Sequence, residues 1–524
     1  MKAIIGIDIG TTSTKTLAYG TDGRIFSEIE KEYPLYSSIP SEKEQNPEEV
    51  YSAVIETIRD TVKVLQEQGV EAAGAGFSSA MHNIMAVDEN GKPLTRLITW
   101  ADQRSVKETE ALKEGNGHDI FLRTGTPIHP MSPLTKLMWY RKNEPALFKQ
   151  AAKWISIKEF VFYRLFGTYA VDYSIASATG LFHLENLDWD EEALRTAGIT
   201  KEQLSIPTKT SSIFTGLKKE LQQELGLSGE TPFVIGASDG VLANVGSGAL
   251  APGVVACSIG TSGAVRTVVD KPYVDPKQRI FCYALSEGRW VIGGPINNGG
   301  IALRWARDKL FPDLKKLAEQ EGKNPYDILN EIIDSVAPAS DGLIFLPYLI
   351  GERAPFWNSD TKGMFFGLTL HHGREHMLRS VMEGVMMQMY SVVIALMEAG
   401  VEPVQFRAGG GFARSQTWKQ MMADMFETEI VIPESHQGSC YGAAWMAMDA
   451  LGMVDSLDSI EQTISIDEKQ YPVNENVTAY RDIKPIFLRM ARDLQDEFKA
   501  ISDVQRSHAE GKRRLSADNE EEIL

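Results

Sequence analysis

The stretch from Ile4 to Lys15 constrains what this chain can fold into more than any other, because an apolar run leads directly into a glycine turn. The repeated isoleucines predict a buried strand. Asp8, its single charge before the turn, is costly to bury there unless a cation or hydrogen-bond donors meet it. Gly10 lets the backbone approach a ligand closely. The pattern predicts a turn that holds phosphate oxygens while Asp8 faces a metal ion through water; a plain hairpin with a polar turn is the alternative.

The same pattern occurs a second time, halfway along the chain. Residues 254–265 form another apolar run, and the turn that reads Ile-Gly-Thr-Thr at 9–12 reads Ile-Gly-Thr-Ser at 259–262. Two such turns at the heads of two halves indicate a duplicated α/β domain. The halves are not chemically equivalent, because Ser258 stands where the first copy has Asp8. The positions in the two stretches that we predict to contact the phosphate groups of a ligand are Gly10, Thr11, Thr12, Lys15, Gly260, Thr261 and Ser262.

Length and composition describe a large globular protein. A chain of 524 residues is too long for one ordinary core, so we expect two large domains and a tail. The net charge of −18 argues against nonspecific nucleic-acid binding. Three scattered cysteines lack metal-ligand spacing and suit a reducing compartment. No signal peptide and no run of roughly 18 apolar residues is evident, so we expect a cytoplasmic protein without a membrane partner.

Residues 72–77 predict a buried strand that delivers Met81 and His82. Ligands of open α/β sheets bind beyond the carboxyl ends of strands, so this is a favourable position for groups that contact a substrate. A structural histidine is the alternative interpretation of His82.

A second group of polar side chains follows another short apolar segment. Trp100, Asp102 and Arg104 combine a ring with charged hydrogen-bonding groups, which suits a polyhydroxylated ligand. An Asp–Arg surface pair at a strand end fits the same residues. His129 lies on a proline-flanked loop shortly afterwards.

Two long segments resemble the signatures of the FGGY carbohydrate kinases, which belong to the actin-like ATPase superfamily. The first signature fits residues 131–143, with the diagnostic residues Pro133, Lys136, Trp139 and Asn143. The second fits residues 363–383, with Gly363, Phe365, Gly367, Leu368, His376, Met377, Ser380 and Glu383. With the repeated glycine turns, the resemblance spans most of the chain. It implies a duplicated actin-like ATPase (ribonuclease H-like) α/β fold with a nucleotide cleft between two domains.

Asp239 ends the apolar strand at residues 232–238, and it could cap the helix that follows. The resemblance implies that Asp239 is the general base that accepts the proton of the sugar hydroxyl. Asp172 opens a small polar segment that suits either close approach to a ligand or simple domain packing. The complete set of predicted substrate-binding residues is Met81, His82, Trp100, Asp102, Arg104, His129 and Asp172.

Glycines precede two predicted helices in the second half. Gly300 closes one glycine-rich segment, and residues 409–411 are three glycines after the predicted strand 405–408. Such loops suit a nucleotide approach, although any tight loop has this composition. The resemblance implies ATP and Mg²⁺, with Asp8 holding the metal through water. It places the nucleotide near Gly300, Gly410, Gly411 and Ser415.

The predicted domains are a sugar-binding domain over 1–248 and a nucleotide-binding domain over 249–455. A helical extension over 456–503 contains one amphipathic helix at 480–501. A tail over 504–524 is predicted to be disordered, because it lacks the apolar residues to form a core.

The expected reaction is ATP-dependent phosphorylation of a small polyol, sugar or sugar acid. Residues 78–82, 100–102 and 125–131 look most like those of family members that phosphorylate gluconate. Another polyol or ketose, such as xylulose or glycerol, is the alternative substrate. An actin-like ATP-binding protein whose output is a conformational change is the alternative class. We expect no nucleic-acid partner, and the sequence leaves a homodimer open.

Overall fold

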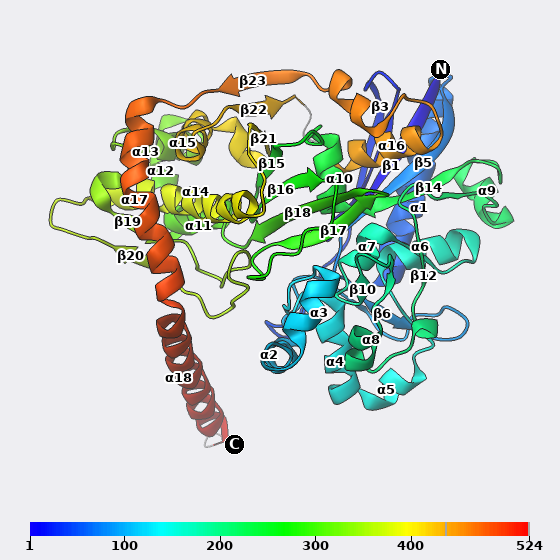
Figure 1. Cartoon of the computed structure of the whole chain (residues 1–524), viewed down its shortest axis with the longest axis horizontal. Coiled ribbons are helices and arrows are strands. Elements are labelled where there is room, and N and C mark those ends of the chain that lie inside the picture. The colour runs from blue at the N-terminus through cyan, green and yellow to red at the C-terminus, as the bar shows by residue number, and fades with distance from the viewer. Residues whose placement is uncertain (435–437, 522–524) are drawn as a thin grey trace. The chain divides into compact units, whose positions relative to one another are not determined.

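The structure, a computed structural model, describes residues 1–434 and 438–521, with side chains up to His508. The backbone forms two compact units (Figure 1). Unit 1 comprises Met1–Ala256, Arg266–Gly293 and Pro433–Asp467, and unit 2 comprises Cys257–Val265, Gly294–Ile432 and the chain from Glu468. Both units therefore combine segments that are distant in the sequence.

The first sheet lies in unit 1 and has six strands in the order β13-β14-β5-β1-β2-β3. Strands β14, β5 and β1 pair in parallel, so their carboxyl ends meet at one edge. The remaining strands pair antiparallel with their neighbours. The bounds are β1 (Lys2–Ile9), β2 (Ser13–Tyr19), β3 (Ile25–Glu32), β5 (Glu71–Ser79), β13 (Ile213–Phe214) and β14 (Phe233–Ser238).

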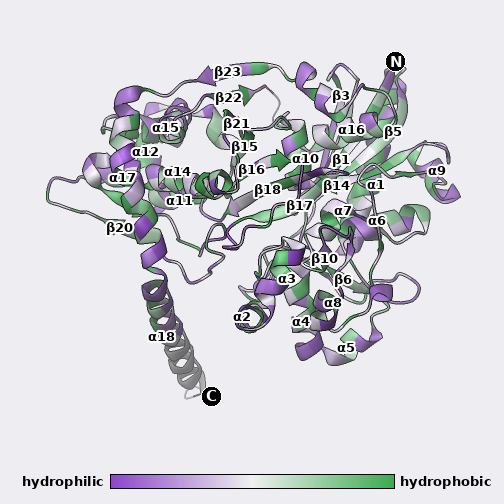
Figure 2. Ribbon diagram, viewed as in Figure 1, coloured by the Kyte–Doolittle hydropathy of each residue, from purple (hydrophilic) through white to green (hydrophobic). Residues whose placement is uncertain are grey.

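Successive side chains of β1 point to opposite faces of this sheet, and different helices cover the two faces. Ile5 and Ile7 pack with α1 and α6, whereas Ile4 packs with α10 and α16. Gly6 and Gly76 let α16 lie against the strands, because an added Cβ would stand 2.1 Å and 2.2 Å from carbonyl oxygens of that helix. In Figure 2 hydrophobic colouring gathers on the strands. The helices are α1 (Pro47–Glu67), α6 (Ile157–Phe166), α9 (Lys219–Leu225), α10 (Asp239–Gly246) and α16 (Gly438–Ala450).

Short strands and helices between β3 and β13 complete much of unit 1, and most of them share a separate apolar core. The strands are β4 (Glu44–Gln45), β6 (Met85–Val87), β7 (Leu97–Ile98), β8 (Lys153–Ile155), β9 (Ala170–Asp172), β10 (Phe182–His183), β11 (Asp188–Trp189) and β12 (Ile206–Thr208). The helices are α2 (Val106–Glu114), α3 (Gly117–Thr124), α4 (Pro133–Asn143), α5 (Pro145–Gln150), α7 (Tyr173–Ser177) and α8 (Glu191–Ala197).

The second sheet has seven strands in the order β17-β18-β16-β15-β21-β22-β23. Its strands include the second glycine-turn hairpin, β15 and β16, as the repeat predicts. The bounds are β15 (Val254–Ile259), β16 (Gly263–Val269), β17 (Phe281–Ser286), β18 (Arg289–Ile296), β21 (Gln405–Gly409), β22 (Ile430–Pro433) and β23 (Ile466–Gln470). A two-stranded sheet, β19 (Ile344–Leu346) and β20 (Met364–Phe366), lies in unit 2.

Helix α14 (Arg374–Glu398) is the central helix of unit 2. Among the described residues it is the one helix long and apolar enough to cross a membrane, but 83% of its most apolar window is buried in the protein. A buried core helix of a globular protein passes the same test. The other helices of unit 2 are α11 (Gly300–Trp305), α12 (Asp313–Glu321), α13 (Pro325–Asp334), α15 (Gln416–Phe426), α17 (Asn474–Asp493) and α18 (Gln495–Glu521).

Three local expectations differ from the structure. The predicted helix at 480–501 is two helices, α17 and α18, which meet at Leu494. Ser238 rather than Asp239 is the N-cap residue of α10, so Asp239 is its first helical residue. Helix α18 continues to Glu521 through most of the segment predicted to be disordered. Alanine, lysine, arginine and glutamate favour helix, so a segment without a core of its own can still be helical.

Candidate active site

The parallel order of three strands brings Asp8, Ser78 and Asp239 to one edge of the first sheet. Asp8 lies opposite Ser78 in the register of β1 and β5, and Ser238 at the end of β14 lies opposite Ser79. Asp239 follows directly as the first residue of α10. The sequence indicates polar groups at these strand ends, and the sheet order makes them neighbours.

Asp8 accepts hydrogen bonds of 2.7 Å from both Ser78 Oγ and Ser439 Oγ. Burial raises the pKa of Asp8, and the two serine hydrogen bonds oppose that rise. No lysine or arginine in the described part of the chain forms an ion pair with this carboxylate. Two hydroxyl groups therefore hold the carboxylate, and the charges of Lys15 and Lys158 favour its ionised form without an ion pair. Such a carboxylate fits a hard cation that is bound through water.

Asp239 is a half-buried carboxylate whose pKa is raised to about 6. Burial and then the charge of Asp8 raise the pKa, whereas the Gly240 N–H at 2.7 Å and the charge of Arg266 lower it. Arg266 and Met81 also lie beside Gly240, where an added Cβ would be 3.5 Å from Arg266 Nε and 2.9 Å from Met81 Cε. Arg266 is not among the residues predicted from the sequence, because it lies on β16, which is remote from Asp239 along the chain.

A buried lysine holds the end of β14 in place. Lys158 Nζ donates to the carbonyl oxygens of Ile235 and Ala237 at 3.1 Å and 2.9 Å. It also pairs with Asp172 Oδ2 at 2.7 Å. Asp172 caps α7 by accepting a hydrogen bond from the Ile175 N–H at 2.9 Å. Asp172, predicted to bind substrate, is thus buried against a cation and an amide of its own chain.

His82 is buried and has a left-handed backbone, with φ of 63°. Its Nδ1 donates to the carbonyl oxygen of Ala178 at 2.7 Å, and its Nε2 is 3.4 Å from the Tyr283 hydroxyl. Lys136 Nζ donates to the carbonyl oxygens of His82 and Thr99 at 2.5 Å and 2.7 Å, and burial lowers the pKa of Lys136 to about 7. Non-glycine residues with a left-handed backbone, such as His82, are found often at functional sites.

Three of the predicted charged contacts, Asp102, Arg104 and Lys15, are already paired within the chain. Asp102 accepts a backbone hydrogen bond from Lys43 and a salt bridge from Arg104 at 2.9 Å. Arg104 also pairs with Glu44 at 2.6 Å, and these carboxylates raise the pKa of its guanidinium. Lys15 Nζ lies 3.3 Å and 3.5 Å from two glutamates of β3. The chain itself thus provides counter-charges for Arg104 and Lys15.

The glycine turn of unit 1 connects to the predicted substrate residues through Trp100. The Gly10 N–H donates to the Ser13 carbonyl oxygen at 2.9 Å, which closes the turn. Trp100 Nε1 donates to Thr11 Oγ1 at 3.0 Å. The indole of Trp100 therefore orients the Thr11 hydroxyl, whereas Thr12 at the tip of the turn is exposed to solvent.

His129 is buried on the loop that precedes α4. Its Nδ1 accepts a hydrogen bond from the Met131 N–H at 3.1 Å, and its carbonyl oxygen accepts one from Thr135 Oγ1 at 3.2 Å. These bonds give the ring a fixed orientation in unit 1.

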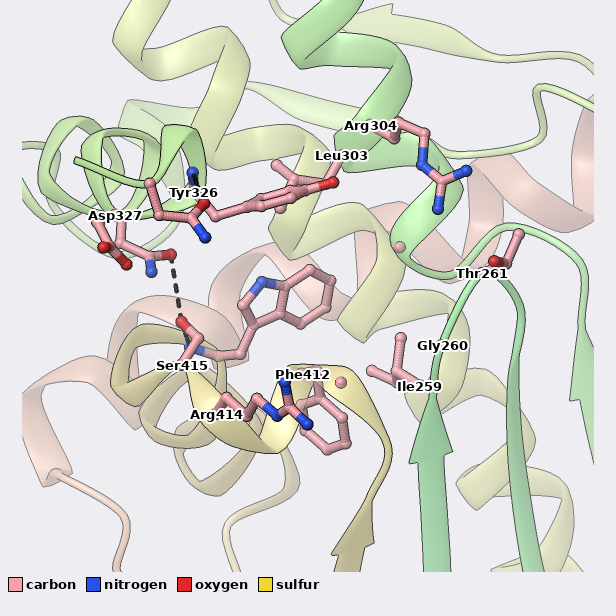
Figure 3. A pocket seen from close by; sticks show the side chains of 15 residues that line it. Ile259, Gly260, Thr261, Leu303, Arg304, Tyr326, Asp327, Phe412, Arg414 and Ser415 are labelled. Carbon is pink, nitrogen blue, oxygen red and sulfur yellow. Dashed lines mark hydrogen bonds between the residues drawn. The ribbon is translucent and has the colours of Figure 1, made fainter. Parts of the chain in front are cut away.

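Unit 2 contains a pocket of about 450 Å³ (Figure 3). Figure 3 shows Tyr326 and Leu303 on one side of the pocket and Phe412 and Arg414 on the other. An aromatic base fits against the apolar and aromatic side chains of such a pocket. The lining includes five residues predicted to contact the nucleotide: Gly260, Thr261, Gly300, Gly411 and Ser415.

Three glycine segments of unit 2 lie close together at this pocket. The Gly300 N–H donates to the carbonyl oxygen of Gly260 at 2.8 Å, and an added Cβ at Gly300 would stand 2.7 Å from that oxygen. Gly410 has φ of 92°, and an added Cβ would stand 2.5 Å from the Ile259 carbonyl oxygen. Ser262 is not a lining residue; its carbonyl oxygen closes the turn by accepting from the Gly260 N–H at 2.8 Å.

The pocket lining combines predicted residues, such as Ser415, with residues that the sequence analysis did not predict. Ser415 also acts as the N-cap of α15, and its hydroxyl contacts Asn330 at 3.2 Å. The segment that supplies Tyr326 and Asn330 carries only the Asn-Pro start signal of a helix, which does not indicate a binding surface. The lining residues without a sequence prediction are Ile259, Leu303, Arg304, Asn324, Tyr326, Asp327, Asn330, Phe412, Arg414 and Trp418.

Comparisons with known proteins identify the same architecture. Residues 3–246 match the N-terminal domain of the FGGY family of carbohydrate kinases, and residues 255–451 match its C-terminal domain. The chain is 49% identical to gluconokinase of Bacillus subtilis (strain 168) over 505 residues, which cover 96% of this chain and 98% of that protein. The structure is similar to gluconate kinase from Lactobacillus acidophilus, with a TM-score of 0.89, 34% identity and coverage of 95% and 99%. It is equally similar to ligand-bound xylulose kinase from the same species, with a TM-score of 0.90, 34% identity and coverage of 96% and 100%.

Proposed function

Because the chain belongs to the FGGY family of carbohydrate kinases, we propose that it phosphorylates D-gluconate to 6-phospho-D-gluconate with ATP. The fold class and the ATP-dependent sugar kinase activity predicted from the signatures are confirmed by the family. The observation that favours gluconate is the 49% identity to a gluconokinase over nearly the whole chain. Xylulose is the second candidate, because a xylulose kinase is as similar in fold as a gluconate kinase.

Asp239 is the proposed general base. Its carboxylate, with a pKa of about 6, is ionised at neutral pH and is a stronger base than an ordinary aspartate. It accepts the proton of the acceptor hydroxyl as that oxygen bonds to the γ-phosphorus and the bond to the β-phosphate oxygen of ATP breaks. Lys158 supports this role, because it holds the strand that positions Asp239.

The pocket of unit 2 is the proposed adenosine site, with the base between Tyr326 and Phe412. The glycine turns at 10–12 and 260–262 are proposed to donate backbone hydrogen bonds to phosphate oxygens. Asp8 fits the Mg²⁺ that the family implies, because its carboxylate is held by hydroxyl groups without a paired cation. When bound, Mg²⁺ neutralises charge that develops on the phosphate oxygens.

The gluconate carboxylate requires a cation or several hydrogen-bond donors in a desolvated site. Of the predicted substrate-binding residues with a cationic or titratable side chain, Arg104 is already compensated by Asp102 and Glu44. The other two are His82 and His129, whose ring nitrogens contact carbonyl, hydroxyl and amide groups of the chain. Arg266 adds a cation beside Asp239 that the sequence did not indicate.

The test is ADP release measured with gluconate, xylulose, glycerol and other sugar acids, with NMR of the product. We expect the highest kcat/KM for gluconate and phosphorylation of its O6. A His82→Gln variant should lose about 2–4 kcal/mol of transition-state stabilisation for gluconate and much less for a neutral polyol. A preference for xylulose would assign the second candidate. ATP hydrolysis that is independent of any acceptor would indicate the actin-like alternative.

A further inference from the structure

Unit 2 carries a compact cluster of one carboxylate and two imidazoles that none of the proposed catalytic or nucleotide contacts uses. Asp341 lies in the short turn η3 (Ser340–Gly342), His371 in the loop before α14, and His376 in the first turn of α14. Asp341 Oδ2 is 3.2 Å from Nε2 of His371 and 3.2 Å from Nε2 of His376. The three potential ligand atoms all lie within 4.8 Å of one another.

These separations match the edges of a metal coordination shell. Tetrahedral Zn²⁺ with bonds of about 2.0–2.2 Å places neighbouring ligand atoms about 3.3–3.6 Å apart. The two observed nitrogen–oxygen separations of 3.2 Å are close to that range. Two imidazoles with one carboxylate suit Zn²⁺ and similar transition-metal ions, whereas Mg²⁺ and Ca²⁺ prefer oxygen ligands alone.

The turn that carries the carboxylate is held in place by the same helix that carries His376. Ala339, Ser340 and Asp341 have φ of 73°, 48° and 50°, a left-handed run that needs support from its surroundings. Glu383 of α14 is fully buried and accepts hydrogen bonds from the Ala339 N–H at 2.9 Å and Ser340 Oγ at 2.7 Å. The carboxylate and one imidazole are therefore arranged before any ion binds.

An outer carboxylate supports one of the two imidazoles. His376 Nδ1 accepts a hydrogen bond from the Gly373 N–H at 3.1 Å and lies 3.2 Å from Glu375 Oε1. With Nε2 on a metal ion the proton moves to Nδ1, which then donates to the Glu375 carboxylate in place of accepting from Gly373. Metal-bound histidines commonly have such a partner. His371 has a side chain that is 74% exposed, which leaves a path for an ion from solvent. The neighbouring His372 has Nδ1 at 2.9 Å from the Thr369 N–H, so it stabilises the loop.

We propose that Asp341, His371 and His376 form a binding site for a divalent transition-metal ion of the Zn²⁺ type, with water completing the coordination. The ion joins the turn at 340–342 to the start of α14. Without the ion, the same residues form hydrogen-bonded carboxylate–imidazole pairs.

The test uses the untagged full chain, stripped with a chelator and dialysed, and titrated calorimetrically with Zn²⁺. Co²⁺ absorption in the visible range then reports the coordination geometry. We expect one Zn²⁺ per chain and a low-symmetry Co²⁺ spectrum. His371→Ala and Asp341→Asn should remove this stoichiometric binding, and Glu375→Gln should weaken it about 10–100-fold.

His508→Ala is the matched control, because it removes an exposed imidazole from another part of unit 2. It should bind Zn²⁺ as the unaltered chain does. His371 is an exposed loop residue, so its loss should leave folding and kinase activity with Mg²⁺ intact. Absence of stoichiometric Zn²⁺ binding to the unaltered chain would overturn the proposal. Equal affinity in the unaltered chain and in His371→Ala would overturn it as well.

Discussion

At the residue scale, the chemistry of Asp239 depends on its neighbours more than on its residue type. An isolated aspartate has a pKa near 3.8, whereas burial and Asp8 raise that of Asp239 to about 6. Asp239 is not among the residues that line the pocket of unit 2 that we propose for the nucleotide. We therefore predict that Asp239→Asn lowers kcat by about 10²–10⁴-fold and changes ATP affinity only a few-fold.

Steady-state kinetics and equilibrium nucleotide binding check this prediction. Asp60→Asn, an exposed aspartate of α1, is the control and should retain full activity. A kcat for Asp239→Asn within five-fold of the unaltered enzyme would mean that another group accepts the proton.

Arg266 provides a second prediction at this scale. A general base acts when ionised, so kcat/KM for the acceptor should fall as the pH drops below about 6. The charge of Arg266 lowers the pKa of Asp239, so its removal in Arg266→Met should raise that pKa. We predict that the acidic limb of the pH–rate profile moves to higher pH in this variant. An unchanged limb would show that the group titrating in the profile is not beside Arg266.

At the scale of elements, the loop between β21 and α15 should tolerate a methyl group at one glycine and not at the next. Gly410→Ala places Cβ 2.5 Å from the Ile259 carbonyl oxygen at φ of 92°, whereas a Cβ at Gly409 has open space around it. We predict that Gly410→Ala raises the KM for ATP at least ten-fold, because the loop must move at the pocket. Gly409→Ala is the matched control, and similar KM values for the two variants would contradict the prediction.

The link between α6 and α7 gives a prediction about positioning. Asp172→Asn leaves Lys158 without its ionic partner in a buried environment, which costs about 3–5 kcal/mol. We predict a corresponding loss in denaturant stability and a lower kcat, with little change in the KM for the acceptor. Asp188→Asn removes the partner of Lys201 in an exposed pair and should change stability little. A raised KM with normal stability would instead assign Asp172 to substrate binding, as the sequence predicts.

At the scale of the whole molecule, the compact units do not follow the linear halves of the chain. Helix α16 lies within the stretch predicted as the second domain, but it packs on the first sheet and brings Ser439 to Asp8. Gly442 makes this packing close, since an added Cβ would stand 2.1 Å from the Leu242 carbonyl oxygen of α10. The segment that completes the environment of Asp8 therefore comes from late in the chain.

The C-terminal helix tests how far the compact structure extends. Ending the chain after Asp503 removes Arg506, whose ion pair with Asp360 is partly exposed, so we predict a melting temperature within a couple of degrees of the full chain. Ending it after Leu494 also removes the buried Phe498, which contacts Tyr348, and should lower the melting temperature further. A large loss on the first truncation would show that the terminal segment contributes to the folded core.

The sequence by itself determined the repeated fold and its chemistry, because these depend on local patterns. Apolar runs before Gly10 and Gly260 predict strands that end in turns, and Asp239 directly follows another apolar run. The family signatures likewise depend on residue order alone. From these patterns the kinase class, the strand ends and five residues of the pocket could be predicted.

Only the tertiary structure decided which groups meet. The approach of Arg266 to Asp239, of Ser439 to Asp8 and of Tyr326 to the glycine loops joins residues that are remote along the chain. Charge compensation also depends on the tertiary structure. The sequence predicts that Arg104 and Asp172 contact a ligand, whereas in the structure each side chain is paired with an opposite charge of the chain. Free energies of pairing and burial depend on distances in space, which sequence spacing does not contain.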